Sequence, residues 1–168
     1  MDFKYRKLLL QEAEDFWNMM NELDNETKFM LYEPGEREKN KNIPLLTKTI
    51  ERSITGDDFL TVAECNGKMA GYIWAQKGSL SRILHTAYIV VGVLENYRGK
   101  GIGTEFFKRL DQWAEEKQVT RLELTVMCPN TFAKRLYEKS GFAVEGIRKN
   151  SMHVDGEFVD EYYMAKVL

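Results

Sequence analysis

A short glycine-rich segment offers the clearest chemistry in this sequence. Residues 97–104 read Tyr-Arg-Gly-Lys-Gly-Ile-Gly-Thr and follow the apolar run 87–94. Glycines let backbone N–H groups approach a ligand closely, and the N-terminus of a following helix adds unpaired donors and partial positive charge. Arg98 and Lys100 place two cations beside these donors. The segment therefore predicts an anion site whose expected ligand carries phosphate.

The spacing of the glycines excludes two familiar phosphate-binding motifs. A P-loop requires G-x-x-x-x-G-K-[ST], whereas Gly99-Lys100 is followed here by another glycine. A dinucleotide fingerprint requires G-x-G-x-x-G, but Phe106 stands where its third glycine belongs. The pattern that fits is R-x-x-G-x-G, on Arg98, Gly101 and Gly103.

A second motif follows, one expected helix and one expected strand further along the chain. Residues 130–142 read Asn-Thr-Phe-Ala-Lys-Arg-Leu-Tyr-Glu-Lys-Ser-Gly-Phe. The first segment resembles the acyl-CoA pyrophosphate loop of the GNAT superfamily of N-acetyltransferases. The second resembles the motif N-x-x-A-x-x-L-Y-x-x-x-G-F of the same superfamily. The positions that match are Asn130, Ala133, Leu136, Tyr137, Gly141 and Phe142.

This resemblance covers roughly residues 59–167, and the region before it fits more loosely. It implies an α/β fold of the GNAT type, with a central mixed sheet of six to seven strands flanked by about four helices. The whole chain, residues 1–168, is then expected to form a single N-acetyltransferase domain. The implied activity is transfer of the acetyl group of acetyl-CoA to an amine, without a metal.

The resemblance also implies which residues bind acetyl-CoA. The strand before the loop would hold the pantetheine arm, the loop the pyrophosphate, and the second motif would add further contacts. The expected residues are Val91, Gly92, Val93, Arg98, Gly99, Lys100, Gly101, Ile102, Gly103, Thr104, Asn130, Ala133 and Tyr137. A solvated surface cation is an alternative for Lys100, and helix capping alone is an alternative for Asn130. Gly92 within an apolar strand indicates a bulge or a close backbone approach.

Two steps of the implied reaction need a group that donates a hydrogen bond or a proton. When the amine attacks the thioester, a backbone N–H near Val91 or Gly92 could stabilise the tetrahedral oxyanion. When the CoA thiolate leaves, a general acid can donate a proton to it. Tyr137 matches the position where the family places that acid, although periodicity alone would make it an ordinary core aromatic.

The attacking amine must also lose a proton, because free alkylammonium groups have a pKa of about 10.4. The family often uses a carboxylate on the central strand, but here that strand carries His85 and Tyr88 with no acid between them. His85 is the first candidate base, because the unperturbed pKa of histidine is about 6.5. Glu95, backbone-held water and a purely structural role for His85 stay open.

The acceptor site is expected between the N-terminal helices and the last two strands. Its candidate residues are Tyr32, Glu33, Glu36, His153, Asp155, Glu157 and Tyr162, whose carboxylates and aromatic rings suit a cationic amine. A solvated acidic rim is the alternative. The expected partner is a small-molecule amine, such as an amino acid, a polyamine or an amine antibiotic. A protein N-terminus or lysine is an alternative acceptor, and a non-catalytic acyl-CoA sensor is an alternative of another class.

Hydrophobic periodicity predicts the elements that would position these residues. The expected strands are 3–10, 59–65, 68–76, 85–93, 121–127, 142–149 and 157–167, and the expected helices are 11–23, one containing Ile43, Leu46 and Ile50, 102–117 and 131–140. Residues 31–44 are expected to form a loop leading into the second helix. Asn66-Gly67 and Asp155-Gly156 predict tight turns. The nearly continuous apolar run 85–93 suggests a strand buried on both faces.

Composition and charge limit the class of protein and its expected partners. The 168 residues carry a formal charge of −2 without a basic run, which gives no support for a nucleic-acid or membrane-surface partner. The sequence shows neither a bilayer-spanning apolar stretch nor a signal-peptide core. Two distant cysteines, Cys65 and Cys128, indicate neither disulfides nor zinc and favour a cytoplasmic location. A homodimer is a common assembly for such a chain.

Overall fold

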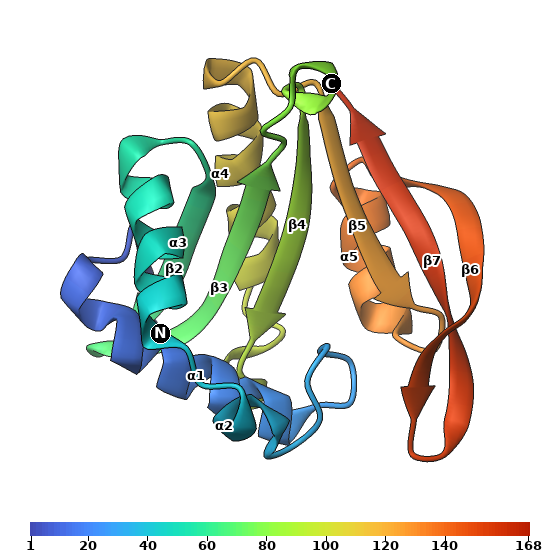
Figure 1. Cartoon of the computed structure of the whole chain (residues 1–168), viewed down its shortest axis with the longest axis horizontal. Helices are drawn as coiled ribbons and strands as arrows, with labels where there is room; N and C mark the ends of the chain where they lie inside the picture. The colour runs from blue at the N-terminus through green and yellow to red at the C-terminus, as the bar shows by residue number, and fades with distance from the viewer. The chain divides into compact units, whose positions relative to one another are not determined.

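The computed structural model describes residues 1–168, and its seven strands are hydrogen-bonded in the order β1-β2-β3-β4-β5-β7-β6 (Figure 1). The strands are β1 (Lys4–Arg6), β2 (Phe59–Cys65), β3 (Lys68–Lys77), β4 (Thr86–Val93), β5 (Arg121–Met127), β6 (Ala143–Val154) and β7 (Glu157–Val167). The helices are α1 (Ala13–Glu26), α2 (Glu36–Lys39), α3 (Ile43–Thr55), α4 (Ile102–Glu116) and α5 (Thr131–Lys139). β4 and β5 pair in parallel, whereas β1–β2, β2–β3, β5–β7 and β6–β7 pair antiparallel. The predicted mixed α/β sheet is confirmed.

The chain forms two compact units. The first contains residues 1–76 and 90–106, and the second contains residues 77–89 and 107–168. The single domain expected over residues 1–168 stays a prediction. None of the helices combines the length and the apolar character that crossing a bilayer requires.

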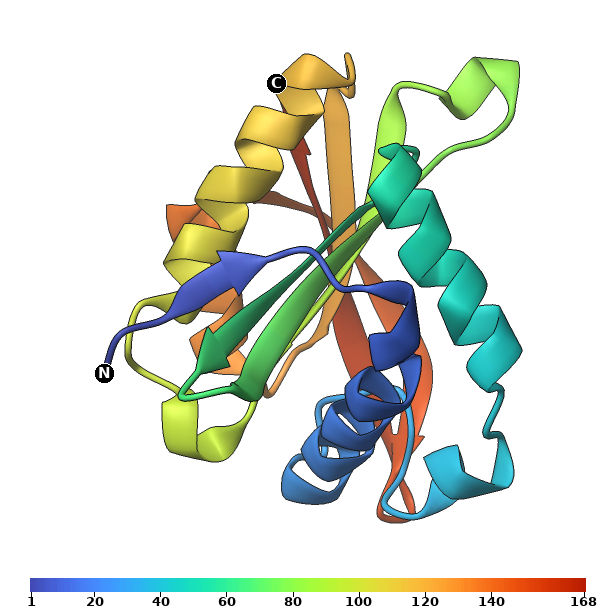
Figure 2. The same ribbon diagram turned by 90° about the vertical axis from the view of Figure 1, so that its left-hand side faces the viewer.

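In the first unit, α1 and α3 cover one face of the β2–β3 hairpin (Figure 2). The predicted apolar face of α1 is buried, with at most 8% exposure at Ala13, Phe16, Trp17, Met20 and Leu23. Ile50 of α3 is fully buried, and Ile43 and Leu46 pack against the same core. The rings of Phe16 and Tyr72 meet edge-on, with centroids 5.2 Å apart. These contacts fix α1 and α3 on the hairpin.

Local signals set the ends of these elements. The Asn42 side chain accepts a hydrogen bond from the Leu45 backbone at 3.0 Å and so caps α3, which ends at Gly56 in the left-handed region. The β2–β3 turn has φ 51° at Asn66 and 76° at Gly67. Because a type I′ turn needs positive φ at both central residues, the predicted hairpin is confirmed.

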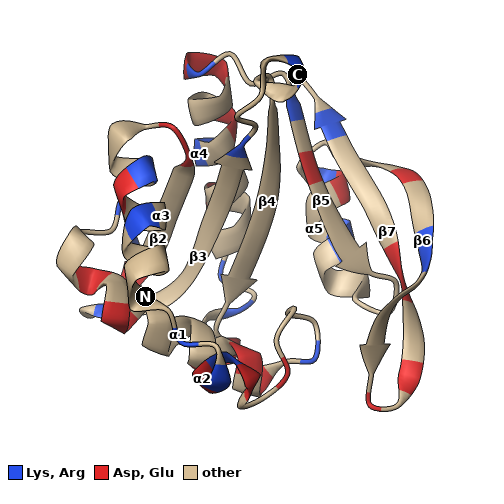
Figure 3. Cartoon of the chain, in the orientation of Figure 1, with Lys and Arg blue, Asp and Glu red and all other residues tan.

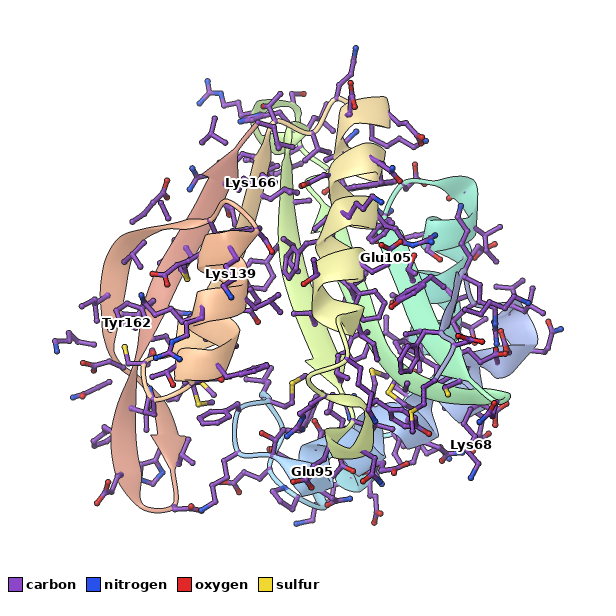
Figure 4. All side chains as sticks on the ribbon, turned by 180° about the vertical axis from the view of Figure 1, so that it is seen from behind. Lys68, Glu95, Glu105, Lys139, Tyr162 and Lys166 are labelled. Carbon is purple, nitrogen blue, oxygen red and sulfur yellow. The ribbon has the colours of Figure 1, made fainter.

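The second unit contains most of α4, α5 and the strands β5, β7 and β6. Along β5, Leu122, Leu124 and Val126 are buried, while the intervening residues are partly exposed. Gly141 ends α5 with φ 94°, as predicted for a left-handed stop. Lys166 of β7, labelled in Figure 4, donates to both carboxylate oxygens of Asp111 in α4 at 2.8 and 2.7 Å. This ion pair joins the sheet to the helix within the unit.

Besides shifted ends, such as β6 running to Val154 and α1 to Glu26, three parts of the structure differ from the sequence-based expectation. The strand expected over residues 3–10 is only Lys4–Arg6, because the Glu12 carboxylate accepts from the Leu9 backbone at 2.7 Å and favours a 3₁₀ turn at 10–12. The four-residue α2 lies within the expected loop 31–44. β4 is not buried on both faces, since Tyr88 is 41% exposed.

The two cysteines are free thiols. Cys65 at the end of β2 is 4% exposed, whereas Cys128 after β5 is only half-buried. The Cys128 backbone donates to the Asp160 carbonyl at 2.9 Å, which holds the cysteine beside β7.

Candidate active site

The predicted pyrophosphate loop lies in the first unit, between a 3₁₀ turn at 95–97 and the start of α4. Gly99 has φ 71° and Gly101 has φ 83°, in the left-handed region that favours glycine. No atom lies within 4 Å of the position that a Cβ would take on either glycine. The backbone N–H groups of residues 102–104 begin the helix and have no acceptor within it. This loop therefore offers open space beside backbone donors, which fits a phosphate group.

The two cations of the loop have partners within the first unit. Arg98 Nε donates to the Val93 carbonyl at 2.9 Å, and Arg98 Nη2 lies 3.9 Å from Glu26 Oε2. Lys100 Nζ donates to the Asn96 carbonyl at 2.5 Å. Both side chains thus brace the loop against the segment that precedes it. Because a carbonyl has two lone pairs, Val93 can still accept a second hydrogen bond.

Gly92 of β4 sits where other parts of the chain approach closely. A Cβ on Gly92 would overlap Leu23 Cδ2 of α1 and lie 3.5 Å from the Tyr72 ring. A Cβ on Gly71 of β3 would lie 2.6 Å from the Gly92 carbonyl oxygen. The close approach expected at Gly92 is therefore present. The half-buried Val91 and Val93 flank it, but their role in binding pantetheine stays a prediction.

The end of α1 also holds the turn before the loop. Glu26 Oε2 accepts a hydrogen bond from the Glu95 backbone N–H at 2.7 Å. The Glu95 side chain is exposed, in the turn that precedes α4 (Figure 4). Sequence reasoning missed Glu26, because nothing in the chain order links it to a turn 69 residues later.

Tyr137 lies on α5 in the second unit and is buried, with 8% of its surface exposed. Its ring meets Phe107 nearly edge-on, with centroids 5.6 Å apart, and lies 6.3 Å from Phe142. Burial, together with the nearby Tyr88, raises the pKa of Tyr137 above its usual value of 10. The phenol therefore keeps its proton at neutral pH and can act as a donor.

Asn130 caps the helix that carries Tyr137. Its Oδ1 accepts a hydrogen bond from the Ala133 backbone N–H at 3.2 Å. Capping, which the sequence left open as the whole role of Asn130, is thus present. Contacts of Asn130 and Ala133 with acetyl-CoA stay predictions.

A polar cluster of the second unit joins β4, β5 and β7. Tyr88 and Thr125 share a hydrogen bond of 2.9 Å between their hydroxyls, and the Tyr163 hydroxyl donates to Glu123 Oε2 at 2.9 Å. Arg121 pairs with the other Glu123 oxygen. Glu123 lies opposite Tyr88 in the parallel register. The second unit thus carries a carboxylate on the strand beside β4, although β4 itself has none.

Glu123 was not among the predicted residues, because it lies on β5 and the expected carboxylate belonged to the central strand β4. The signal was present in the alternation of β5, which puts Arg121, Glu123 and Thr125 on the face opposite its buried residues. Burial and the hydrogen bond to Glu123 raise the pKa of Tyr163. The phenol therefore acts as the donor and the carboxylate as the acceptor in this pair.

His85 lies in the turn before β4, and its side chain is exposed. Its carbonyl accepts hydrogen bonds from the Thr120 and Arg121 backbone N–H groups, at 2.9 and 3.1 Å. The backbone of His85 thus joins β4 to β5, which is a structural role. Its role as a base stays a prediction.

The predicted acceptor residues fall into both units. Tyr32, Glu33 and Glu36 belong to the first unit, and His153, Asp155, Glu157 and Tyr162 belong to the second. Two of the aromatic rings already face cations of the chain. Arg37 Cζ lies 4.5 Å from the Tyr32 ring centroid, and Lys134 Nζ lies 5.3 Å from that of Tyr162, labelled in Figure 4. Sequence reasoning missed the buried Asp24, the ion-pair partner of Arg37.

Two solved structures share this fold. An acetyltransferase of the GNAT family from Streptococcus pneumoniae matches with a TM-score of 0.92 at 22% identity, over 99% of each chain. A GNAT superfamily phosphinothricin acetyltransferase from Sinorhizobium meliloti, in complex with acetyl-CoA, matches with a TM-score of 0.84 at 16% identity. That match covers 100% of this chain and 89% of the other. The fold is therefore that of the GNAT acetyltransferases.

The sequence comparison gives the family. The model of the acetyltransferase (GNAT) family matches residues 17–142. The L-amino acid N-acetyltransferase AaaT of Escherichia coli (strain K12) is 33% identical over 110 residues, which are 63% of this chain and 66% of that protein. The chain thus spans just under two thirds of the length of this relative. It belongs to the acetyltransferase (GNAT) family, and so to a family of acyltransferase enzymes.

Proposed function

We propose that this chain is an acetyl-CoA-dependent N-acetyltransferase that acetylates a primary amine of a small molecule by direct attack in a ternary complex. The observation that carries the proposal is the open loop with positive φ at Gly99 and Gly101, placed directly before α4. Family membership supports acetyl transfer. The name of the Escherichia coli relative supports a small acceptor.

In this proposal, the loop binds the pyrophosphate of acetyl-CoA mainly through backbone N–H groups. Arg98 and Lys100 are held by carbonyls of the chain, so they act chiefly as positive charges near the phosphates. Val91, Gly92 and Val93 bind the pantetheine arm through their backbone. Acetyl-CoA supplies the activated acetyl group as a thioester.

The proposed acid is Tyr137. The phenol of Tyr137 is protonated at neutral pH, since burial raises its pKa further above the usual value of 10, and it can donate to the departing thiolate. A backbone N–H near Val91 or Gly92 is the proposed oxyanion donor.

The proton of the attacking amine has several proposed acceptors. His85, Glu95 and backbone-held water were the candidates from the sequence, and the Glu123–Tyr163 pair adds a carboxylate beside β4. Variants at His85 and Glu123 distinguish these routes, because loss of the true base lowers the rate least at high pH, where the amine is already neutral.

The first experiment measures thiol release from acetyl-CoA against a panel of amino acids, polyamines, aminoglycosides and basic peptides. Release that depends on one class of small amine supports the proposal and names the acceptor. Release with peptides alone would replace the small acceptor by a protein. Acetyl-CoA binding in calorimetry without turnover on any amine would favour a sensor module instead. We propose that the reaction takes place in the cytoplasm. Light scattering tests whether the chain forms a homodimer.

A further inference from the structure

A buried carboxylate of the first unit has one free oxygen. Asp24 lies near the end of α1, and its side chain has no exposed surface. Its Oδ2 accepts a hydrogen bond from Arg37 Nε of α2, but its Oδ1 has no hydrogen-bond partner. Burial raises the pKa of Asp24 even though Arg37 opposes this shift. A buried, unpaired carboxylate oxygen is costly, so this atom needs a donor that the chain itself does not supply.

A second free oxygen lies one helical turn earlier. Asn21 Nδ2 donates a hydrogen bond to Glu38 Oε1 at 3.4 Å, and the amide oxygen Oδ1 takes no part in that bond. That Oδ1 atom is also buried without a hydrogen-bond partner. Side chains three residues apart on a helix are neighbours, with Cβ atoms about 5–6 Å apart. One group with several donors can therefore reach both oxygens.

The charge around these atoms favours a cationic donor. Asp24, Glu36 and Glu38 outnumber Arg37 and Lys39, the two basic residues of α2, and Glu36 acts on Asp24 as a like charge. Figure 3 shows acidic positions on and beside α2. An ammonium group carries three donors and no acceptor, so it satisfies both oxygens and balances a further negative charge.

The two oxygens lie at the end of α1 that contacts the site proposed for acetyl-CoA. Leu23, the neighbour of Asp24, contacts β4 at Gly92, and Glu26 binds the Glu95 backbone. These contacts all belong to the first unit. An acceptor held at Asp24 would therefore be bound at the helix end that meets the strand expected to hold the pantetheine.

We propose that Asp24 Oδ1 and Asn21 Oδ1 bind a second ammonium group of the acceptor, so that the substrate class is a diamine or polyamine. This inference rests on the proposed function, and the amine that is acetylated is the one not held by Asp24. The bound ammonium keeps its proton throughout the reaction. Because Asp24 has no exposed surface, Arg37 and the Tyr32 ring beneath it shift aside when the ligand binds.

Binding is measured by calorimetry without acetyl-CoA, using 1,4-diaminobutane and, as the matched probe with one amine, n-butylamine. The wild type is expected to bind the diamine at least about tenfold more tightly than the monoamine. Asp24→Asn should reduce this preference to about twofold or less. Equal affinities in the wild type, or an unchanged preference in Asp24→Asn, would overturn the proposal.

Arg37→Gln separates ligand binding from a purely structural role of Asp24. If Asp24 binds the ligand, removal of the competing guanidinium should tighten diamine binding several-fold. If Asp24 only docks α2, Arg37→Gln and Asp24→Asn should weaken diamine binding alike, which counts against the proposal. Asn21→Ala is the second variant should Asp24→Asn fail to fold, and it should also reduce the diamine preference.

Turnover with acetyl-CoA distinguishes this inference from the function on which it rests. Acetylation of monoamines and diamines with equal kcat/KM would overturn the diamine subsite but leave the transferase intact. Selective diamine binding without acetylation of any amine would overturn the transferase and leave the subsite. Acetylation of diamines whose KM rises about tenfold in Asp24→Asn, at unchanged KM for acetyl-CoA, supports both.

Discussion

Leu23 of α1 occupies the space that a side chain on Gly92 of β4 would need. The contact brings the helix directly onto the strand that is expected to hold the pantetheine arm. Gly71 of β3 allows a similar approach from the neighbouring strand, because a Cβ there would lie 2.6 Å from the Gly92 carbonyl oxygen. Two glycines thus set how closely α1, β3 and β4 pack in the first unit.

Gly92→Ala should therefore destabilise the protein. The added methyl group overpacks the contact with Leu23, and overpacking costs about 1–3 kcal/mol of the free energy of unfolding. Urea unfolding measures the change. Gly146→Ala on β6 is the control, because no atom lies within 4 Å of the Cβ position there, and it should change the free energy by less than about 0.5 kcal/mol.

The double variant Leu23→Ala/Gly92→Ala tests the cause. Leu23→Ala alone opens a cavity and should cost about 2–5 kcal/mol. Because the new methyl group fills part of that cavity, the double variant should be more stable than the sum of the single effects predicts. Additive effects would show that the Leu23 contact is not what excludes a side chain at Gly92.

Gly101→Ala should weaken acetyl-CoA binding by about tenfold or more, which calorimetry measures. Its φ of 83° strains any other residue by about 1–2 kcal/mol, and its Cβ would project into the open space beside the loop. Gly156→Ala is a close control, since Gly156 also has φ 83° and no atom near its Cβ position. It should lose similar stability but keep its acetyl-CoA affinity. Equal loss of affinity in both variants would contradict a phosphate site at Gly101.

Tyr137→Phe should lower kcat by about 10²-fold or more while acetyl-CoA affinity stays unchanged, because only proton donation is removed. Steady-state kinetics with the identified amine and calorimetry with acetyl-CoA give the two quantities. Tyr5→Phe, on β1 in the first unit, is the control and should keep kcat. A parallel loss of affinity and rate in Tyr137→Phe would make Tyr137 a packing residue.

The raised pKa of Tyr137 also predicts a dependence of stability on alkaline pH. Above about pH 10 the unfolded chain loses the phenolic proton while the folded chain keeps it, so the folded state binds more protons and stability falls as pH rises. Below that pH the contribution is fully present. Urea unfolding between pH 8 and 11 should show a shallower decline for Tyr137→Phe than for the wild type. Identical slopes would contradict the burial effect.

At acid pH the pair Arg6–Glu12 should matter. Arg6 hydrogen-bonds both Glu12 oxygens, at 2.9 and 2.7 Å, and holds the pKa of Glu12 below its usual value. The pair therefore stabilises the fold above about pH 4.3, and this stability is lost as pH falls through the lowered pKa. Arg6→Met, which also removes the ion pair between Arg6 and Glu64 at 2.6 Å, should cost about 1–2 kcal/mol at pH 7 and less at pH 3, by urea unfolding.

Lys149→Met is the control for this prediction. Lys149 pairs with Asp160 at 2.6 Å, but its side chain is 78% exposed, so solvent screens the attraction. We expect no measurable loss of stability at either pH. A loss equal to that of Arg6→Met would show that burial does not distinguish the two ion pairs.

Local signals predicted most of the fold from the sequence. The buried stripe of α1, the Asn66-Gly67 hairpin and the strand Arg121–Met127 all agree with the structure, because each rests on periodicity or turn chemistry within a few residues. The end of β1 and the presence of α2 were not predicted. Both depend on contacts across the chain, such as the bond from Glu12 to the Leu9 backbone and the pairing of Arg37 with Asp24.

The residues of the candidate site likewise include some that the sequence predicts and some that it does not. The glycine loop and Tyr137 are readable because their motifs are contiguous. Glu123 and Asp24 are not readable, because each gains its meaning from neighbours elsewhere in the chain: Tyr88 across the parallel register and Arg37 in α2. A sequence pattern reports which residues lie near one another in the chain, whereas these two carboxylates depend on the fold.

The unequal exposure of the two thiols has a practical consequence for spectroscopy. Cys65 is buried at 4% exposure, so a maleimide dye should attach to the half-buried Cys128 first. A single fluorophore could then be placed in the second unit, beside Asp160, without engineering a new cysteine. The same thiol would react with disulfide reagents that detect released CoA, so Cys128→Ser offers both an unlabelled reference and a quieter assay.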